Sequence, residues 1–344
     1  MPALSHSADD HARQLRDLVA SGRCQDALDY YRSEPGASDW PPEAQLTAAT
    51  AAMRVGDAAA AEAFAAAALE GFGPRADQDG RMRSLNLLGA ASFESGQLAE
   101  AADRFTGALR LAEQLGDALF TARTLNNLAS LAHLRGAADE ALGLYRRALL
   151  AYQRIGDRRG AAETWHNLGL TFRDLGDLTQ AEAATVQAVR HAEVAGDGCL
   201  LALALSGQGE LEIATGRFEV AERTLARAEA LASEGGDDPC VGEVGRLRAL
   251  AALRRGAYAE ARAEADRALS LAMRCRSALL QAECASLAAL AARAMGNTAD
   301  AGRLRDEALD VFARLSAGRF IERFEALWSA GSGPAAAGRA PAPA

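Results

Sequence analysis

The chain has 344 residues, of which 49% are hydrophobic but only 5% aromatic. A core that depends on Ala and Leu suits closely spaced helices and suits strands poorly, since strands favour β-branched and aromatic side chains. The net charge of -9 argues against nucleic acid as a partner, because phosphates require a basic face. All 37 basic residues are arginines, a bias typical of a GC-rich genome, so a phosphate-loop lysine and a Schiff-base lysine are both excluded.

The N-terminal sequence M-P-A-L-S-H-S-A-D-D lacks the basic and apolar regions of a secretory signal. No apolar run reaches the roughly 18 residues that a membrane helix requires. The five cysteines are scattered and odd in number, a pattern that favours reduced thiols over a disulfide framework. We therefore expect a cytoplasmic protein with no membrane partner, no metal site and no cofactor.

Glycines recur along the chain at a fixed step of 40 residues, and Gly22 precedes the first of them by 34. The series runs Gly56, Gly96, Gly136, Gly176, Gly216, Gly256, Gly296. An alanine follows each glycine after five residues, and in all units but the first a second alanine follows seven residues later. A glycine in the left-handed conformation ends a helix, and the alanines let two helices approach closely. The pattern predicts a helix-turn-helix unit repeated eight times.

A second series of Gly-Asp pairs joins each of the middle units to the next, at Gly116, Gly156, Gly196 and Gly236. The glycine would close one helix and the aspartate would cap the following one. Arg276 stands where the next such glycine would fall, so we expect a different geometry at that junction. The sequence S-E-G-G-D-D-P-C at 233–240 predicts a softer joint, and the prolines of 35–42 exclude a continuous helix there.

The stretch 165–188 reads W-x-x-L-G-x-x-F followed by Gly176, Ala181 and Ala188. This sequence resembles the tetratricopeptide repeat, and the resemblance covers roughly residues 8–315. The 40-residue units are similar to the longer subclass found in kinesin light chains, in Leu-Gly-Asn repeat adaptors and in bacterial regulators and peptide sensors. The resemblance implies an all-α fold, a right-handed α-solenoid of about eight repeats. Six further residues per unit lengthen each helix by about 4–5 Å at 1.5 Å per residue.

Two segments follow the array of residues 8–315. The apolar residues of 317–329 lie on one helical face, which predicts a capping helix over the exposed side of the last repeat; a partner-binding or dimerisation helix is the alternative. Residues 331–344 are rich in Ala, Pro and Gly and lack periodicity, so we expect them to be disordered.

The first helices of successive repeats line the concave side of such a superhelix, so their polar side chains are candidates for binding. An Asn amide can pair with a peptide backbone and an Arg can bind a carboxylate. In the peptide-binding relatives, asparagines on the first helices hold an extended peptide, and Asn86 and Asn126 fall at comparable places. A solvated inner surface without a partner is the alternative. The candidates are Arg83, Asn86, Arg123, Asn126, His133, Glu163, His166, Asn167 and Arg173.

The function predicted first is a non-catalytic scaffold that binds a peptide or protein segment in the concave groove. A ligand-responsive bacterial regulator that acts on a separate effector protein is the second hypothesis. The third is an enzyme with a pocket in the superhelix, using His133, His166, Glu163 and Arg173. The familiar nucleophile, metal and nucleotide motifs are absent from the sequence, which favours the scaffold. The sequence leaves the partner and the oligomeric state open.

Overall fold

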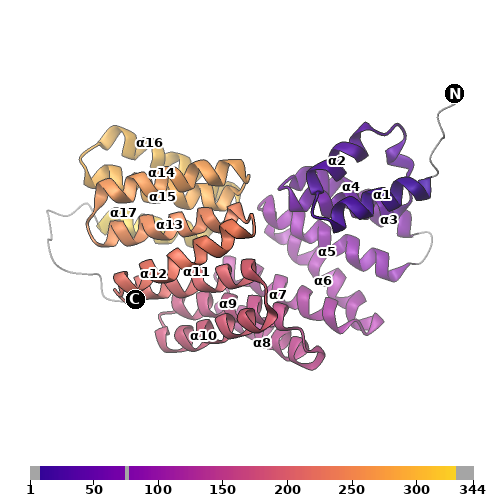
Figure 1. Cartoon of the computed structure of the whole chain (residues 1–344), viewed down its shortest axis with the longest axis horizontal. Helices are drawn as coiled ribbons and strands as arrows, with labels where there is room; N and C mark the ends of the chain where they lie inside the picture. The colour runs from indigo at the N-terminus through magenta and orange to yellow at the C-terminus, as the bar shows by residue number, and fades with distance from the viewer. Residues whose placement is uncertain (1–7, 74–76, 331–344) are drawn as a thin grey trace. The chain divides into compact units, whose positions relative to one another are not determined.

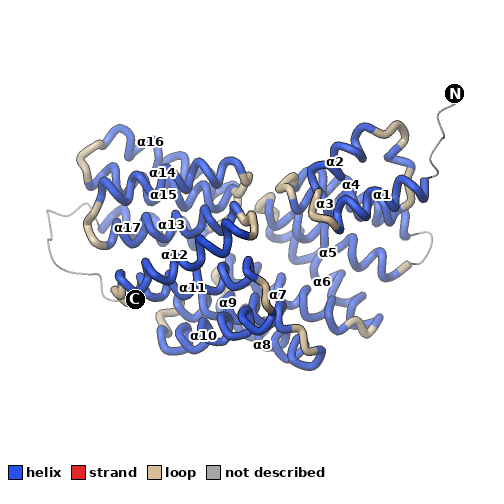
Figure 2. Tube along the Cα trace, viewed as in Figure 1, coloured by secondary structure: helices blue, strands red, loops and turns tan. Residues whose placement is uncertain are grey.

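The computed structural model describes residues 8–73 and 77–330, and these residues form helices joined by short loops, with no strand among them (Figures 1 and 2). Residues 331–344, where we expect disorder, lie outside the described part. The helices are α1 Ala8–Ala20, α2 Cys24–Ser33, η1 Ala37–Asp39, α3 Pro42–Arg54, α4 Ala58–Phe72, α5 Gln78–Glu94, α6 Leu98–Leu115, α7 Ala118–Leu134, α8 Ala138–Ile155, α9 Arg158–Asp174, α10 Leu178–Ala195, α11 Gly198–Ala214, α12 Phe218–Glu234, α13 Asp238–Arg254, α14 Tyr258–Arg274, α15 Ala278–Ala294, α16 Thr298–Arg314 and α17 Gly318–Ala330. The predicted all-α repeat fold is confirmed.

The chain divides into two compact units, Met1–Leu131 and Ala132–Ala344, with the boundary near the end of α7. In unit 1 the odd-numbered helices α1, α3 and α5 pack against one another in succession. In unit 2 the odd-numbered helices α9, α11, α13, α15 and α17 do the same. The even-numbered helices α2, α4, α10, α12, α14 and α16 each pack against the odd helix of their own pair and against the next odd helix; Figure 1 shows the labelled helices. Each unit is therefore a two-layered solenoid, and we call the odd-numbered layer the inner layer.

The turns within the pairs have the geometry that the glycine period predicts. Gly176 follows the end of α9 with φ +78°, in the left-handed region where a side chain would be strained. The carboxylate of Asp177 then accepts the backbone N–H of Gln180 at 3.1 Å and caps α10. Gly156 and Asp157 end α8 and cap α9 in the same way. The predicted alternation of left-handed glycine and capping aspartate is confirmed at these junctions.

The expectation of a different geometry at Arg276 is wrong. Arg276 adopts φ +55°, so an arginine occupies the left-handed conformation that glycines adopt elsewhere. Its N–H bonds to Met273 O and the next N–H bonds to Ala272 O, the same pattern that Gly116 and Asp117 form. The junction after α12 is also short, since only residues 235–237 separate α12 from α13, and the softer joint expected there stays a prediction. Helix packing on both sides therefore imposes one turn geometry whatever the local sequence.

The two alanine series form the contact between the layers. Ala61, Ala101, Ala181, Ala221 and Ala261 are at most 1% exposed. Side chains of this size let helix backbones approach closely, and larger residues fill the remaining space in the core. Those larger residues are Phe72, Phe105, Tyr145, Tyr152 and Phe312, each almost completely buried.

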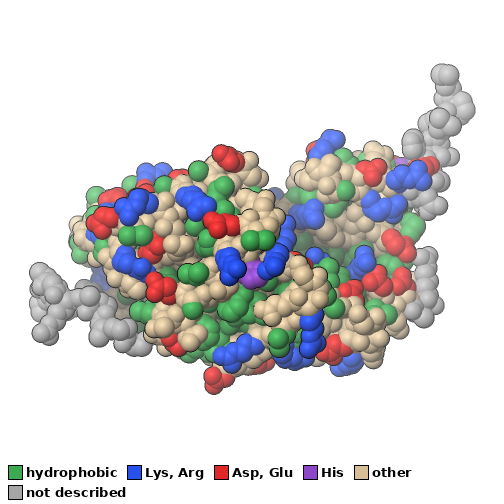
Figure 3. All heavy atoms as spheres, turned by 60° about the horizontal axis from the view of Figure 1, so that its bottom comes forward, with side chains coloured by type: hydrophobic (Ala, Val, Ile, Leu, Met, Phe, Trp, Pro, Cys, Tyr) green, Lys and Arg blue, Asp and Glu red, His purple; other side chains and the backbone are tan. Residues whose placement is uncertain are grey.

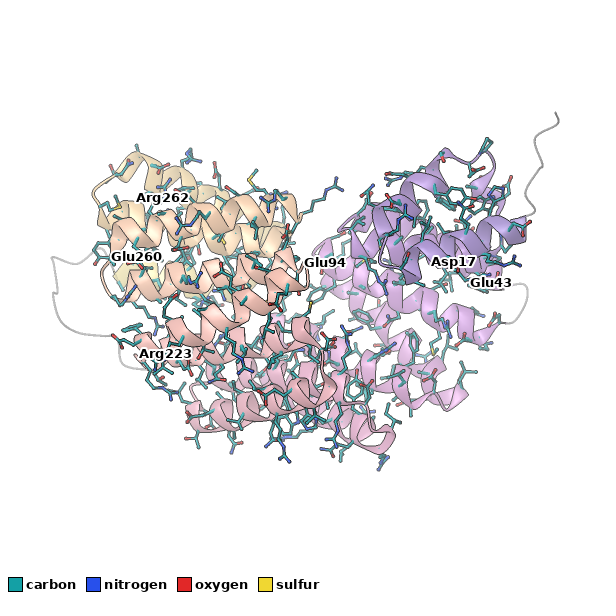
Figure 4. All side chains as sticks on the ribbon, in the orientation of Figure 1. Asp17, Glu43, Glu94, Arg223, Glu260 and Arg262 are labelled. Atoms are coloured by element: carbon teal, nitrogen blue, oxygen red, sulfur yellow. The ribbon has the colours of Figure 1, made fainter. Side chains whose placement is uncertain are left out.

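Ion pairs join second helices that are neighbours in the outer layer of unit 2. Arg262 of α14, labelled in Figure 4, binds Asp266 at 2.8 Å within its own helix and also pairs with Asp300 of α16. Arg227 of α12 pairs with Glu193 of α10 at 3.2 Å. The Arg227–Glu193 pair is exposed and contributes little to stability, about 0–1 kcal/mol, whereas the Arg262–Asp300 pair is half-buried.

Helix α17 covers the last repeat of unit 2. Phe320 stacks on Phe312 of α16 with ring centroids 5.6 Å apart, and Phe324 is buried. The guanidinium of Arg293 on α15 lies 4.6 Å from the centre of the Trp328 ring. The expected capping of the array by an apolar helix face is confirmed.

The surface mixes charges of both signs. In the view of Figure 3 basic, acidic and apolar side chains are interspersed, and the basic ones do not form a continuous face. Within the described residues, no helix combines the length and apolar character that crossing a membrane requires.

Candidate functional site

In unit 1 the inner layer presents polar side chains at equivalent positions of two repeats. Arg83 on α5 and Arg123 on α7 are 40 residues apart and both are exposed. Asn86 and Asn126, one helical turn further along, are half-buried. The Asn127 amide donates to Asn86 Oδ1 at 3.3 Å, so the asparagines of neighbouring inner helices meet. Four of the predicted residues therefore lie in a polar row on α5 and α7.

The five predicted residues of unit 2 separate into two groups. Glu163 and Asn167 lie on α9, and Glu163 pairs with Arg159 of the same helix at 3.4 Å. His133, His166 and Arg173 belong instead to a cluster of charged and polar groups on the inner layer. The sequence prediction that all of these line one binding surface is untested, but His133, His166 and Arg173 do share one environment.

The centre of that cluster is Glu210 of α11. One carboxylate oxygen forms an ion pair with Arg173 of α9, and the other lies 3.5 Å from Arg246 of α13. Arg246 also binds Glu243 at 2.5 Å and Glu283 of α15 at 3.5 Å. We call the group the inner network; it consists of Arg173, Asp174, Glu210, Glu243, Arg246 and Glu283. It links four successive inner helices.

The inner network is largely removed from water. The side chain of Arg246 is 4% exposed and that of Glu210 is 9% exposed. Burial alone would raise the pKa of Glu210, but the guanidiniums of Arg173 and Arg246 outweigh it and lower the pKa to about 2. Burial raises the pKa of Glu283, even though Arg246 opposes the shift. The charges of Arg173, Arg246 and Glu210 are therefore mutually satisfied.

His166 is held in its neutral form beside the network. Its ring lies against Gly207 of α11, where a Cβ would come within 2.7 Å of the ring nitrogen Nδ1. Burial lowers the pKa of His166 to about 4, with Arg173 adding to the effect and Glu210 and Glu243 opposing it. Gly207 thus makes room for a half-buried histidine that carries no charge at neutral pH.

His133 lies between a hydroxyl and a carboxylate. Thr171 Oγ1 is 3.0 Å from His133 Nδ1, and Asp174 Oδ2 is 3.4 Å from Nε2. The order resembles that of a nucleophile, base and acid. Thr171, however, is only 1% exposed and donates its proton to Asn167 O at 2.9 Å, so the hydroxyl accepts from the imidazole. This geometry orients His133 and does not activate Thr171 as a nucleophile.

Helix α17 supplies two further groups to this region. Arg319 binds Asp174 at 2.5 Å and lies 3.2 Å from His133 Nε2. Arg323 lies 3.6 Å from Glu283. Two residues of the C-terminal helix therefore reach carboxylates of α9 and α15.

Sequence reasoning missed most of the inner network. A signal for Glu210 exists, because it is the only charged residue in a row of the 40-residue period that reads Ala90, Ser130, Leu170, Glu210, Leu250, Leu290. Glu243, Arg246 and Glu283 occupy the same rows as the predicted residues but in later repeats. No sequence pattern indicates that Arg319 contacts Asp174, because the two are far apart in the chain.

Residues 120–193, which span α7 to α10, match the family model described as tetratricopeptide repeat. Comparison with curated protein sequences finds no match.

Three solved structures illustrate the similarity of fold. The Rap conjugation gene regulator of the plasmid pLS20 in complex with the Phr* peptide has a TM-score of 0.68 at 13% identity, covering 90% of this chain and 94% of that one. NprR in complex with its cognate peptide NprX has a TM-score of 0.60 at 14% identity, covering 95% and 99%. Aspartyl phosphate phosphatase F from Bacillus subtilis has a TM-score of 0.54 at 14% identity, covering 96% and 94%. At these identities the likeness concerns the fold alone.

Proposed function

The chain is a helical repeat protein of the tetratricopeptide type, and from this premise we propose that it is a non-catalytic scaffold for a peptide or protein segment. The segment binds along the inner layer, and the protein works in the cytoplasm without nucleic acid as a partner. Two solved structures with this fold are complexes with a peptide. That precedent supports the proposal without identifying the ligand.

The observation that carries the proposal is the polar row of unit 1. Core packing explains the buried alanines and leucines of α5 and α7, but it does not explain Asn86, Asn127 and the exposed Arg123. Asn is a poor helix former, so asparagines inside helices usually have another role. Their amides can exchange the contact with each other for contacts to a peptide backbone, which offers both donors and acceptors.

The inner network of unit 2 changes the role we assign to Arg173. In the sequence it is a candidate to bind a ligand carboxylate, but in the structure it binds Glu210 and Asp174. A buried arginine that already has two carboxylate partners contributes little binding energy to a third carboxylate from a ligand. We therefore assign the direct ligand contacts to Arg83, Asn86, Arg123 and Asn126, with Glu163 and Asn167 as the candidates on α9.

A regulator that acts on a separate effector is a variant of the same proposal. Two of the fold neighbours are named as a gene regulator and a complex with a cognate peptide. In this variant, binding at the inner layer would change the arrangement of the repeats. It differs from a static scaffold in that the ligand alters the affinity for a second protein.

The catalytic alternative has one supporting observation, the phosphatase among the fold neighbours. The groups of this chain that most resemble a catalytic set, Thr171, His133 and Asp174, have the hydrogen-bond polarity of a structural contact. His166 has a strongly perturbed pKa but packs against Gly207 rather than facing an open cavity. We therefore propose no reaction for this chain.

The experiment compares single variants of the full chain against a partner identified by affinity purification. The affinity of a fluorescent peptide from that partner is measured for Asn86→Ala, Asn126→Ala and Arg123→Ala. Loss of one or two hydrogen bonds predicts a decrease of about 5- to 30-fold for each, at 1.4 kcal/mol per tenfold. Arg110→Ala on the outer helix α6 is the matched control and leaves the affinity unchanged. Equal affinity in all four variants would remove the polar row from the proposal.

A further inference from the structure

We propose that α17 is an internal occupant of the inner layer of unit 2, and that the partner of this surface is an amphipathic helical segment, with arginines on one side, that displaces it. Such a segment carries two arginines four residues apart and an apolar face beside them. The inference rests on the proposed function in that it names a ligand class for the inner layer. It concerns unit 2, whereas the polar row of Asn86 and Asn126 belongs to unit 1.

Helix α17 has two faces with different surroundings. Phe320 and Phe324 face the cluster that Phe312 and Ala317 form at the end of the array. Arg319 and Arg323, one turn apart, face the inner network instead. A helix that only closed the last repeat would require the apolar face alone, so the two arginines identify a second contact.

The contact of the arginine face is with carboxylates of distant repeats. Arg319 is 28% exposed and binds Asp174, which is 12% exposed. It also lies against His133, 186 residues earlier in the chain. Arg323 approaches Glu283 and acts electrostatically on Glu210. The helix therefore spans the inner layer from α9 to α15.

The charge of the surface under α17 determines the chemistry of its ligand. Arg173 and Arg246 are already paired with Glu210, and Arg246 also with Glu243. The carboxylates of Asp174 and Glu283 each accept an additional guanidinium, and both of these come from α17. Without α17 the surface has carboxylates in excess at these two places. It therefore accepts a segment that presents guanidiniums at these two places and disfavours one that presents carboxylates there.

Helix α17 is held weakly enough for another segment to displace it. It has 13 residues, and Phe324 is its only buried side chain. Leu327 is 40% exposed, and the remaining large apolar side chains are half-buried. Helices of this length are only marginally stable in isolation, so α17 depends on its contacts with the array. A segment that offers the same contacts competes for the same place.

The test uses the full chain and a synthetic peptide with the sequence of Gly318–Ala330, blocked at both ends. Amide hydrogen exchange of the 318–330 segment is followed by mass spectrometry as unlabelled peptide is added. We expect the exchange of this segment to accelerate at least tenfold at saturation, because the peptide takes its place. A peptide carrying R319E and R323E binds at least tenfold more weakly and leaves the exchange unchanged. Equal binding of both peptides, or binding without accelerated exchange, would overturn the inference.

A second test weakens α17 in the full chain and measures the affinity for the added peptide. Arg319→Ala combined with Arg323→Ala weakens the internal competitor, so the full chain binds the unaltered peptide about tenfold more tightly. Asp174 keeps Arg173 and His133 as partners in this variant, so the repeats retain their fold. Arg314→Ala, in an exposed pair on α16, is the control and leaves the affinity unchanged. Weaker or unchanged affinity of the double variant would contradict displacement.

The two proposals fail separately. If the peptide does not bind while Asn126→Ala still weakens the partner of unit 1, α17 is only a cap and the scaffold function stands. If the peptide displaces α17 but the polar row has no effect on any partner, the inner network is a binding surface and the proposal for unit 1 is wrong.

Discussion

At the scale of single residues, the inner network sets the charge state of the middle of unit 2. Glu210 pairs with Arg173 and Arg246, one from each of the two inner helices that flank α11, and both arginines are largely removed from water. Removing one member of such a buried group unbalances the charges of the others. The resulting loss in folding stability is larger than the stability that the intact group contributes. The network therefore specifies how α9, α11 and α13 pack side by side.

Glu210→Ala is expected to lower the free energy of unfolding by about 1–3 kcal/mol, since Arg173 and Arg246 lose their shared carboxylate but keep Asp174 and Glu243 as partners. Urea denaturation followed by circular dichroism measures the change. Glu193→Ala is the matched control, because Glu193 forms an exposed pair with Arg227 and its loss changes stability by less than about 1 kcal/mol. Similar losses for both variants would show that the network does not stabilise the packing.

His166 predicts how stability depends on pH. Its pKa is lowered to about 4 in the folded chain, against 6.5 for an unperturbed histidine. Between these values the unfolded chain binds a proton that the folded chain does not, so stability falls as the pH is lowered from about 6.5 to about 4. The decrease amounts to about 1–3 kcal/mol. Below that window Glu210, with a pKa of about 2, adds a second decrease as the pH falls from about 4.5.

Denaturation midpoints of the full chain and of His166→Asn, measured between pH 7 and pH 4, check this dependence. The variant should show a smaller decrease, with the contribution of His191 remaining because burial lowers its pKa as well. A variant with the same pH profile as the unaltered chain would contradict a neutral His166.

Some of these residues could be predicted from the sequence and others could not. The period placed Asn86 and Asn126 at equivalent points on inner helices, because a repeat puts the same position on the same face. The same reasoning assigned Arg173 to ligand binding and did not find its partner Glu210. Which charged side chains meet depends on packing between helices of different repeats, and a pattern along one helix does not contain that information.

At the scale of elements, one turn geometry is repeated irrespective of the residue that occupies it. Arg276 and Ser316 adopt positive φ where most junctions have glycine. An L-residue in this region is less stable by about 1–2 kcal/mol, so the flanking helices must hold these turns in place. The sequence predicted the positions of the turns from the glycines, but it could not show that Arg276 would follow them. The packing of α14 and α15 determines the backbone conformation of Arg276.

Arg276→Gly should therefore raise stability by about 1 kcal/mol, because it relieves the strain of the left-handed conformation without removing an ion pair that holds the turn. Gly176→Ala should lower stability by a similar amount, since Gly176 has φ +78°. Thermal denaturation of both variants is the measurement. Gly143→Ala is the control: Gly143 lies within α8 with open space around its Cα, so alanine there is neutral or stabilising. A loss of stability in Arg276→Gly would contradict the strain.

At the scale of the whole molecule, the repeat architecture explains both what was predictable and what was not. A period of 40 residues determines pairs of helices, an inner layer and an outer layer, and these follow from glycine and alanine positions alone. Helix α17 has a feature that could not be predicted from the period. Its apolar face was recognisable as a cap, but its contact with Asp174 arises because the solenoid brings the last helix of unit 2 to an early one.

The claim that the inner layer binds a peptide or protein segment is tested most directly by the footprint of a bound partner. Amide hydrogen exchange of the full chain is compared with and without a saturating partner peptide. The account predicts slower exchange in the inner helices α5 and α7, with the outer helices α6 and α8 unchanged. Protection confined to the outer helices, with α5 and α7 unaffected, would contradict it.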